Sequence, residues 1–394
     1  MSANWKRQAL GDALEIASGQ VDPTVEPYSE MPHIGGDNIE SGTGRIIGSA
    51  TANELGMTSG KYLFSSEDVL YSKIRPNLNK VALPAFAGIC SADIYPLRPN
   101  LSRLSREFLA HLLRSNDFLE YTEKHSARTN IPKLNRESLL SYEALLPPIE
   151  EQRRIAEALD QAEALRVKRR AALAQLDALT QAIFLELFGD PATNPKGWPN
   201  KAVGVLASKF SDGPFGSNLK SSHYTETGVR VIRLQNIGAG EFVDNDRAFI
   251  SERHFSDLKK HECLPGDVLV GTLGDPNLRA CLQPEWLPRA LNKADCVQLR
   301  VDQRIAHPVY VCSLLNQPST ERMAQELILG QTRLRISMGR LRGLQVPVPP
   351  IGLQHVFARR VAAVEKLKAT HRASLAELDA LFASLQHRAF RGEL

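Results

Sequence analysis

The feature that most constrains this chain is an internal repeat. Residues 146–152 read LPPIEEQ, and residues 348–354 read VPPIGLQ, at an offset of 202 positions. The same offset carries QLDAL at 175–179 onto ELDAL at 377–381. Self-similarity over this length predicts two copies of one folding unit rather than one continuous core.

Shorter matches extend the repeat towards the N-terminus of each copy. The offset drifts only from 193 to 202 residues, so differences in loop length separate the two copies. The matches are Trp5 with Trp198, Asn38-Ile39 with Asn236-Ile237, Asp68-Val69-Leu70 with Asp267-Val268-Leu269, Pro76-Asn77-Leu78 with Pro276-Asn277-Leu278, Ala92-Asp93 with Ala294-Asp295, and Leu97-Arg98 with Leu299-Arg300.

Each copy begins with a mixed stretch that favours short strands. Runs such as VRVIRL at 229–234 and DVLV at 267–270 are apolar and bounded by Gly or Pro, as strands are. One amphipathic helix is expected within each stretch, at residues 106–121 and 308–329. We therefore predict an α+β fold with two similar globular domains, each a mixed sheet with helices.

A Pro-Pro pair in each copy is followed by a long helix, because proline is tolerated where the first helical N–H groups lack partners. The helices are predicted at Glu150–Phe188 and Gly352–Phe390, with apolar spacings that alternate between three and four residues, as in a coiled-coil seam. The seam positions are Ile155, Leu159, Ala162, Leu173, Leu176, Ile183 and Leu187, and then Phe357, Val361, Val364, Leu375, Leu378, Phe382, Leu385 and Ala389.

Two related helices of one length, each leaving a separate domain, favour antiparallel pairing as a coiled coil with pseudo-two-fold symmetry. Arg166 interrupts the first seam where Lys368 interrupts the second. Trp5 precedes the first domain as Trp198 precedes the second, so the N-terminal segment is expected beside Phe390. The predicted domains are 1–149 and 191–349, and the predicted helical segments are 150–190 and 350–394.

Composition restricts the class of protein only broadly. The chain is 43% hydrophobic and 23% charged, as ordinary globular proteins are. Its net charge of +4 neither requires nor excludes DNA binding. Five cysteines without a CxxC pair predict reduced thiols rather than a zinc site. With neither a signal sequence nor a membrane-spanning apolar run apparent, we expect a cytoplasmic protein that binds no membrane.

The chain resembles the specificity subunits of Type I restriction-modification enzymes over nearly its whole length. The stretches that carry the resemblance are 146–156 (LPPIEEQRRIA) with the helix that follows, 212–220 (DGPFGSNLK) and 231–238 (VIRLQNIG). Their order, which occurs twice, is more specific than any one of them. The second copy departs from the pattern, since Gly352-Leu353 replaces Glu150-Glu151.

The resemblance implies two target-recognition domains, each reading one half of a bipartite site in double-stranded DNA. The paired helices would act as a spacer and as a platform for two methyltransferase subunits. No cofactor is expected on this chain, because S-adenosylmethionine, ATP and Mg²⁺ would bind the methyltransferase and the restriction-translocase subunits of the full complex. The two domains differ in most loop residues, so the site is expected to be asymmetric.

Catalytic motifs do not favour an enzyme. The two Pro-Pro pairs lack the preceding Asn or Asp and the following aromatic residue that a base-methylating loop needs. Residues 56–62 (GMTSGKY) are too short for a phosphate-binding loop. We therefore predict a non-catalytic subunit. The alternatives are a nuclease or methyltransferase with an unrecognised site, and a coiled-coil scaffold that binds only proteins.

Basic windows free of carboxylates are the candidate DNA contacts, because phosphates attract Lys and Arg and repel acids. Arg and Lys also read guanine edges, while Asn and Gln read adenine edges. The first copy offers Lys73, Arg75, Asn77, Asn79, Lys80, Arg128, Asn130 and Lys133, with Arg136 alongside. The second offers Ser217, Asn218, Lys220, Gln235, Asn277, Arg279, Gln331, Arg333 and Arg335. A solvated charged loop is the alternative for each residue.

Overall fold

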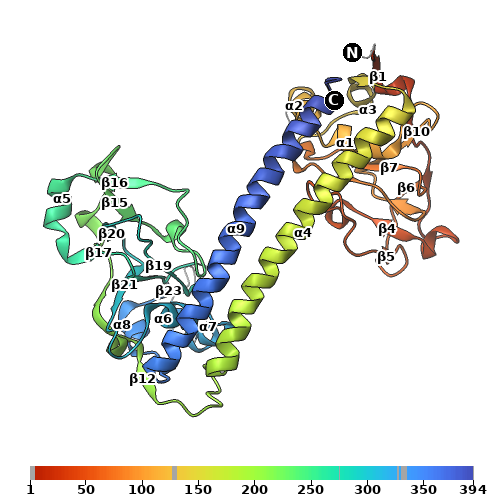
Figure 1. Cartoon of the computed structure of the whole chain (residues 1–394). Coiled ribbons are helices and arrows are strands. Elements are labelled where there is room, and N and C mark those ends of the chain that lie inside the picture. The colour runs from red at the N-terminus through yellow and green to blue at the C-terminus, as the bar shows by residue number, and fades with distance from the viewer. Residues whose placement is uncertain (1–4, 127–130, 275, 326–327, 330–334, 394) are drawn as a thin grey trace. The chain divides into compact units, whose positions relative to one another are not determined.

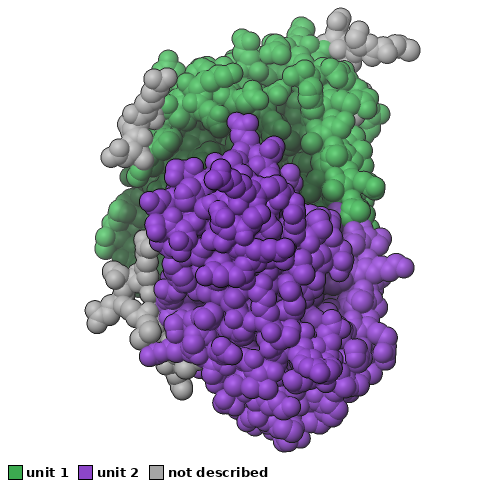
Figure 2. Space-filling model, turned by 90° about the vertical axis from the view of Figure 1, so that its left-hand side faces the viewer, with its two compact units in different colours: residues 1–171, 373–394 green, residues 172–372 purple. Residues whose placement is uncertain are grey.

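The computed structural model describes residues 5–126, 131–274, 276–325, 328–329 and 335–393. The chain forms two compact units (Figure 2): unit 1 consists of residues 1–171 and 373–394, and unit 2 of residues 172–372. Both long helices are divided between the units, so each unit contains part of each helix. The ranges predicted from the sequence cut the chain at the helix starts instead.

Unit 1 contains two main sheets and three short helices. The four-stranded sheet is antiparallel, while the five-stranded sheet has one parallel pair at its centre, β9 with β4. In spatial order the first sheet is β2 (Leu14–Ile16), β10 (Ile94–Pro99), β7 (Val69–Ser72) and β8 (Val81–Ala82). The second is β3 (Gln20–Val21), β6 (Lys61–Phe64), β9 (Gly88–Cys90), β4 (Pro32–Ile34) and β5 (Ala50–Thr51). The remaining elements are the pair β1 (Lys6–Ala9) with β11 (Glu143–Leu146), and helices α1 (Arg106–Leu113), α2 (Asn116–His125) and α3 (Arg136–Leu140).

The described residues of unit 2 form the same two main sheets and a further two-stranded pair. Its four-stranded sheet is ordered β13 (Ala207–Ser211), β21 (Cys296–Val301), β18 (Val268–Gly271) and β19 (Arg279–Leu282). Its five-stranded sheet is ordered β14 (Tyr224–Thr225), β16 (Ala248–Ile250), β15 (Val229–Ile232), β20 (Ala290–Asn292) and β17 (Glu262–Cys263). The pairs are β12 (Asn200–Ala202) with β24 (Gln345–Pro347) and β22 (Ile328–Leu329) with β23 (Arg335–Ile336), and the short helices are α5 (Glu252–Asp257), α6 (Pro308–Leu315), α7 (Pro318–Gln325) and α8 (Met338–Gly343).

The repeat seen in the sequence is therefore a repeat of topology, and the predicted α+β fold is confirmed. Both four-stranded sheets have the same order in terms of the repeat, and both five-stranded sheets are centred on one parallel pair, β4 with β9 and β15 with β20. A buried aspartate also recurs. Asp68 binds Arg98 in unit 1 at 3.0 Å, and Asp267 binds Arg300 in unit 2 at 2.8 Å.

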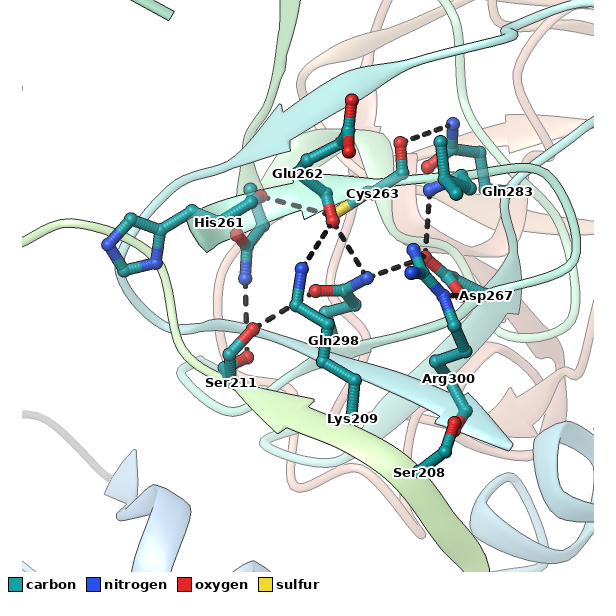
Figure 3. A network of polar contacts seen from close by, with 12 residues as sticks. Ser208, Lys209, Ser211, His261, Glu262, Cys263, Asp267, Gln283, Gln298 and Arg300 are labelled. Carbon is teal, nitrogen blue, oxygen red and sulfur yellow. Dashed lines mark hydrogen bonds and ion pairs between the residues drawn. The ribbon is translucent and has the colours of Figure 1, made fainter. Parts of the chain in front are cut away.

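The Asp267 network shows how the two sheets of unit 2 are joined (Figure 3). Its carboxylate accepts hydrogen bonds from Gln298 Nε2 on β21 at 2.5 Å and from the backbone N–H of Leu264 at 2.7 Å. Gln298 Nε2 and Lys209 Nζ also reach the carbonyl oxygen of Glu262 on β17, at 2.9 and 2.8 Å. The Asp267 carboxylate and the Glu262 carbonyl oxygen, both bound by Gln298, thus connect the four-stranded sheet to the edge of the five-stranded sheet.

The predicted single amphipathic helix of each copy is wrong, since it is two helices in each case, and in the second copy Ile328–Leu329 lies in strand β22 rather than in a helix. In unit 1 the break falls between α1 and α2, where the Ser115 side chain accepts a hydrogen bond from Phe118 N and starts the second helix. In unit 2 Pro318 begins α7. A capping serine and a proline both favour a new helix start, and these local signals override the continuous apolar pattern.

The long helices are α4 (Ile149–Phe188) and α9 (Ile351–Ala389), within a residue of their predicted bounds (Figure 1). Their antiparallel pairing is confirmed within each unit. In unit 1 Arg166 Nε lies 2.6 Å from Asp379 Oδ1. In unit 2 Lys368 Nζ lies 2.8 Å from Asp177 Oδ1. The two pairs are equivalent in the repeat. Each basic residue that interrupts the apolar seam, Arg166 or Lys368, therefore forms an ion pair with an aspartate of the other helix.

Aromatic residues at the helix ends bind each unit together. Phe184, Phe188, Phe357 and Tyr310 are buried against one another in unit 2, with ring centroids 4.8 to 5.7 Å apart. Unit 1 buries Ile155, Leu159 and Phe390 with Phe108 in its core, and Trp5 packs against the same cluster. The predicted position of Trp5 beside Phe390 is confirmed.

Two further observations concern the chain as a whole. All five cysteines are buried with free thiols, as predicted. Among the described residues, α4 is the one helix long and apolar enough to cross a membrane, by length and composition alone. Core helices of soluble proteins pass the same test, and the apolar side chains Ile183 and Phe184 of α4 are buried in unit 2, so this is weak evidence for a membrane span.

A buried glutamine ties the start of each long helix to its globular part. Gln152 is fully buried, and its Oε1 accepts a hydrogen bond from Ser105 N at 2.9 Å while Nε2 donates to Pro147 O at 2.8 Å. Gln354 makes the equivalent bonds with His307 N and Pro349 O, at 2.8 and 2.7 Å. The glutamine that both Pro-Pro motifs share therefore has a structural role, whereas the acidic pair Glu150-Glu151, present only in the first motif, takes no part in these bonds.

We predict that Gln354→Leu destabilises unit 2 by about 1–3 kcal/mol, because it leaves a buried N–H and a buried carbonyl without their partner. Urea denaturation would measure the change in the free energy of unfolding. Gln181→Leu, at an exposed position of α4 in the same unit, is the matched control and should stay within ~0.5 kcal/mol of the wild type. Equal effects of the two substitutions would contradict the structural role of Gln354 as a clamp between the start of α9 and its unit.

Candidate nucleic-acid interface

Two basic windows that lie far apart in the sequence meet in unit 1. Ile74 and Lys133 form an isolated β-bridge. Arg75 N donates a hydrogen bond to Pro132 O at 2.8 Å, and Leu134 N donates to Lys73 O at 2.9 Å. The segment after β7 and the segment before α3 therefore form one surface, which we call the unit 1 junction (residues 73–75 and 132–136).

The junction is repeated in unit 2, where an equivalent β-bridge and two equivalent backbone hydrogen bonds are found among the described residues. Leu273 and Arg335 form the bridge, and Ile336 N donates to Thr272 O at 3.0 Å. Thr272 N donates to Asp295 O at 3.0 Å, just as Lys73 N donates to Asp93 O at 3.0 Å in unit 1. These bonds make Thr272 the counterpart of Lys73 and Arg335 the counterpart of Lys133, and they define the unit 2 junction (residues 272–273 and 335–338).

The unit 1 junction is rich in positive charge. Lys73 is buried, and its Nζ lies 4.9 Å from the ring centroid of Tyr95. The Arg136 guanidinium lies 5.5 Å from the same ring and 5.8 Å from that of Tyr62. Burial lowers the pKa of Lys73, the charges of Lys133 and Arg136 lower it further, and Asp93 acts in the opposite direction. Cations that repel one another in this way favour binding of an anion such as a phosphate.

The other predicted residues of unit 1 surround this junction. Arg75 and Asn77 are exposed, as is Lys133. Arg75 and Asn79 have left-handed backbone conformations, with φ of 47° and 49° on either side of the turn Pro76–Leu78. Asn79 and Lys80 are used internally, since Asn79 Nδ2 donates to Arg114 O and Lys80 Nζ to Gly36 O, at 3.3 and 2.6 Å. Arg128 and Asn130 lie outside the described residues.

The unit 2 junction contains carboxylates that the search for basic windows overlooked. Arg335 Nε lies 2.7 Å from Asp295 Oδ1, and one terminal nitrogen of Arg335 lies 3.7 Å from Asp212 Oδ2. The guanidinium carbon lies 5.2 Å from the ring centroid of Phe215, an exposed side chain. A side chain on Gly213 would begin 2.2 Å from the Lys293 carbonyl carbon, so only glycine lets this segment approach.

The remaining predicted residues of unit 2 fall into two groups. Ser217, Asn218, Lys220 and Gln235 are exposed, the first three just after Phe215. Asn277 is buried, and the Arg279 guanidinium donates to the carbonyl oxygens of Ile237, Pro276 and Leu234, at 2.7, 2.9 and 3.1 Å. Arg279 therefore holds the turn that carries Gln235. Gln331 and Arg333 lie outside the described residues.

Sequence reasoning did not identify the aromatic residues Tyr62, Tyr95 and Phe215 at the two junctions, because they are far in sequence from the cations they contact. Within the described residues, no three His, Cys, Asp or Glu side chains are grouped closely enough to hold a metal ion.

Comparisons with known proteins agree with this organisation. Residues 2–175 match the Type I restriction modification DNA specificity domain. The chain is 34% identical over 237 residues to the Type I restriction enzyme EcoDI specificity subunit of Escherichia coli. This match covers 59% of this chain and 52% of that subunit. The chain therefore spans about half the length of that relative. It is 18% identical over 385 residues to the MjaVIII specificity subunit of Methanocaldococcus jannaschii, covering 92% of this chain and 87% of the relative.

Solved structures show the same fold over the full length. A chain from a study of complex assembly and conformational transition of the type I R-M system has a TM-score of 0.63 at 22% identity, and the match covers 100% of this chain and 99% of that one. The S subunit of M. genitalium has a TM-score of 0.56 at 15% identity, over 98% and 96%. In its repeated topology and its paired helices, as in the sequence of its first half, the chain is similar to Type I restriction-modification specificity subunits.

Proposed function

We propose that this chain is the non-catalytic DNA-reading subunit of a Type I restriction-modification complex, and that each unit reads one half of a bipartite site. The carrying observation is the junction. Two loop segments, predicted separately as DNA contacts, are joined in both units by an equivalent β-bridge and an equivalent backbone hydrogen bond. A backbone that repeats while its side chains differ suits two readers of different half-sites, which makes the target asymmetric.

The long helices support a proposal about protein partners. Large apolar side chains on them are exposed at positions that the repeat makes equivalent, Leu165 with Leu367 and Leu179 with Leu381. Each unit carries one residue of each pair, on different helices. Equivalent exposed leucines suit two copies of one partner, and we assign them to two methyltransferase subunits. Ala174 and Ala178 of α4 are exposed as well, whereas Ala156 of the same helix is buried.

The complex would divide its chemistry among its subunits. S-adenosylmethionine would bind the methyltransferase subunits, while ATP and Mg²⁺ would bind the restriction and translocase subunits. This chain would supply DNA recognition alone and would act in the cytoplasm. A nuclease or methyltransferase activity of the isolated chain, or an inability of the assembled complex to bind DNA in a salt-dependent manner, would instead favour the enzyme or scaffold alternatives.

We predict that the double variant Arg75→Gln and Lys133→Gln weakens DNA binding by the assembled complex and lowers its salt slope by about 2, one unit for each lost phosphate contact. Both residues are exposed at the unit 1 junction, so the fold should be unaffected. The affinity would be measured at several salt concentrations. The control is Lys6→Gln with Arg7→Gln, which removes the same charge from exposed positions of β1. Equal slopes for both double variants would refute a local DNA contact.

A second prediction concerns stoichiometry. Replacing Leu165 and Leu381 with Asp should remove one methyltransferase subunit, and replacing Leu179 and Leu367 should remove the other, since a buried charge at an apolar interface is costly. Light scattering of the purified complex would give its mass. Leu101→Asp changes an exposed leucine away from the helices and should leave two subunits bound. Retention of both subunits by the helix variants would show that these leucines do not bind them.

A further inference from the structure

The two junctions share one backbone but carry opposite charge. In unit 1 the side chains are Lys73, Lys133 and Arg136 beside the single carboxylate of Asp93. In unit 2 the counterparts by offset and hydrogen bonding are Thr272, Arg335 and Met338 beside Asp295. The unit 1 junction thus has three cations and one acid, whereas these positions of the unit 2 junction have one cation and one acid.

The residue that follows strand β13 adds the second acid. Ile16 lies opposite Leu97 in unit 1, and Phe210 lies opposite Leu299 in unit 2, which makes these positions equivalent. Two residues further along the chain, unit 1 has Ser18 and unit 2 has Asp212. The Asp212 carboxylate accepts hydrogen bonds from Gly213 N at 2.7 Å and Asp295 N at 3.1 Å. It therefore also fixes the turn at Asp295, whose φ is 66°.

This arrangement holds Arg335 in place. Asp295 contacts its Nε edge, Asp212 lies on the same side, and its guanidinium lies over the Phe215 ring, while 39% of the side chain stays exposed. An arginine has five N–H donors in a fixed fork, and two carboxylates do not use them all. Among the described residues of the junction, the two acids outweigh the charge of the arginine, which disfavours a phosphate at this position. A guanine edge is uncharged and offers two acceptors, O6 and N7, that match the fork.

We propose that Arg335, held by Asp295 and Asp212, reads a guanine edge in one half-site, whereas its counterpart Lys133 contacts a backbone phosphate beside the other. This inference rests on the proposed DNA-reading function and assigns different tasks to equivalent positions. Fixing the guanidinium before binding reduces the conformational entropy lost on contact. Asp212 and Asp295 act as positioning residues, and they exclude phosphates from the place where the base is read.

Titration of Asp212 gives the proposal an independent signature. Burial raises the pKa of Asp212 to about 6; the Gly213 N–H lowers it, Asp295 raises it and Arg335 lowers it. The other titratable groups that face it are His261, whose Nδ1 lies 2.6 Å from Asp212 O, and the buried thiol of Cys296 on β21. A nearby phosphate would raise the pKa of Asp212 further, so binding of non-target DNA takes up a proton. Non-target affinity should therefore rise as pH falls from about 8 towards 6 and level off below the pKa of the free protein.

The first test uses the full chain assembled with its methyltransferase subunits, with mapping of methylated sites in cellular DNA. Arg335→Lys should lower the preference for guanine at one position of one half-site by roughly 5- to 150-fold. The other half-site should keep its sequence, which shows within the same experiment that the variant is folded. Arg304→Lys, at an exposed arginine of unit 2 that is also paired with an aspartate at 2.8 Å, is the control and should change nothing.

The second test measures binding of the purified complex to target and non-target duplexes between pH 5.5 and 8. Asp212→Asn is isosteric and should raise non-target affinity at pH 8, increase the salt slope by up to about 1, and abolish the pH dependence. If the wild type methylates no specific sequence, the proposed function fails. If the wild type is specific but Arg335→Lys keeps the guanine preference, or Asp212→Asn keeps the pH dependence, the inference on Arg335 is overturned while the function stands.

Discussion

Each unit depends on the buried side-chain amide of a glutamine, which lies where the chain leaves the sheets and enters a long helix. Helix starts leave backbone N–H groups unpaired, and the preceding prolines leave carbonyls that need donors. Gln152 and Gln354 supply both a donor and an acceptor there, and they also bind the backbone just before α1 and α6. The direction of each helix relative to its own unit follows from that clamp. The ion pairs between α4 and α9 then have their partners within reach.

The junctions show how a duplicated fold can keep its backbone while changing its chemistry. The bridge and the hydrogen bonds of residues 73 and 272 use main-chain atoms, which no substitution other than proline removes. The side chains projecting from them are free to change. At this place unit 1 gathers cations over two tyrosines, while unit 2 surrounds one arginine with acids and a phenylalanine. Under the proposed function, the two halves of one chain would therefore bind the same DNA through different forces.

Much of the fold could be predicted from the sequence, because the spacing of apolar residues and the internal repeat determine it. The bounds of α4 and α9, their antiparallel pairing and the place of Trp5 followed from apolar spacing and matching offsets. The break between α1 and α2 was missed because one capping serine outweighs a regular pattern. The site was harder to predict. That Asn277 is buried and that Arg279 binds four carbonyl oxygens depends on which loops fold over them, and a sequence window contains no information on that. The pairing of Arg335 with Asp212 joins residues more than a hundred positions apart.

The placement of Trp5 has a consequence for how such a chain could be rearranged. In unit 1 the Trp5 ring lies against Gly392, just beyond the end of α9. In unit 2 Trp198 Nε1 donates a hydrogen bond to Phe188 O, at the end of α4. The short link from Gly189 to Pro199 thus connects the end of α4 to the start of the second copy. A peptide between residues 392 and 5 would connect the end of α9 to the start of the first copy in the same way. The order of the copies along the gene is then nearly arbitrary. A circularly permuted chain, opened within that link and closed between residues 392 and 5, would keep every contact described for either unit while exchanging which half is translated first.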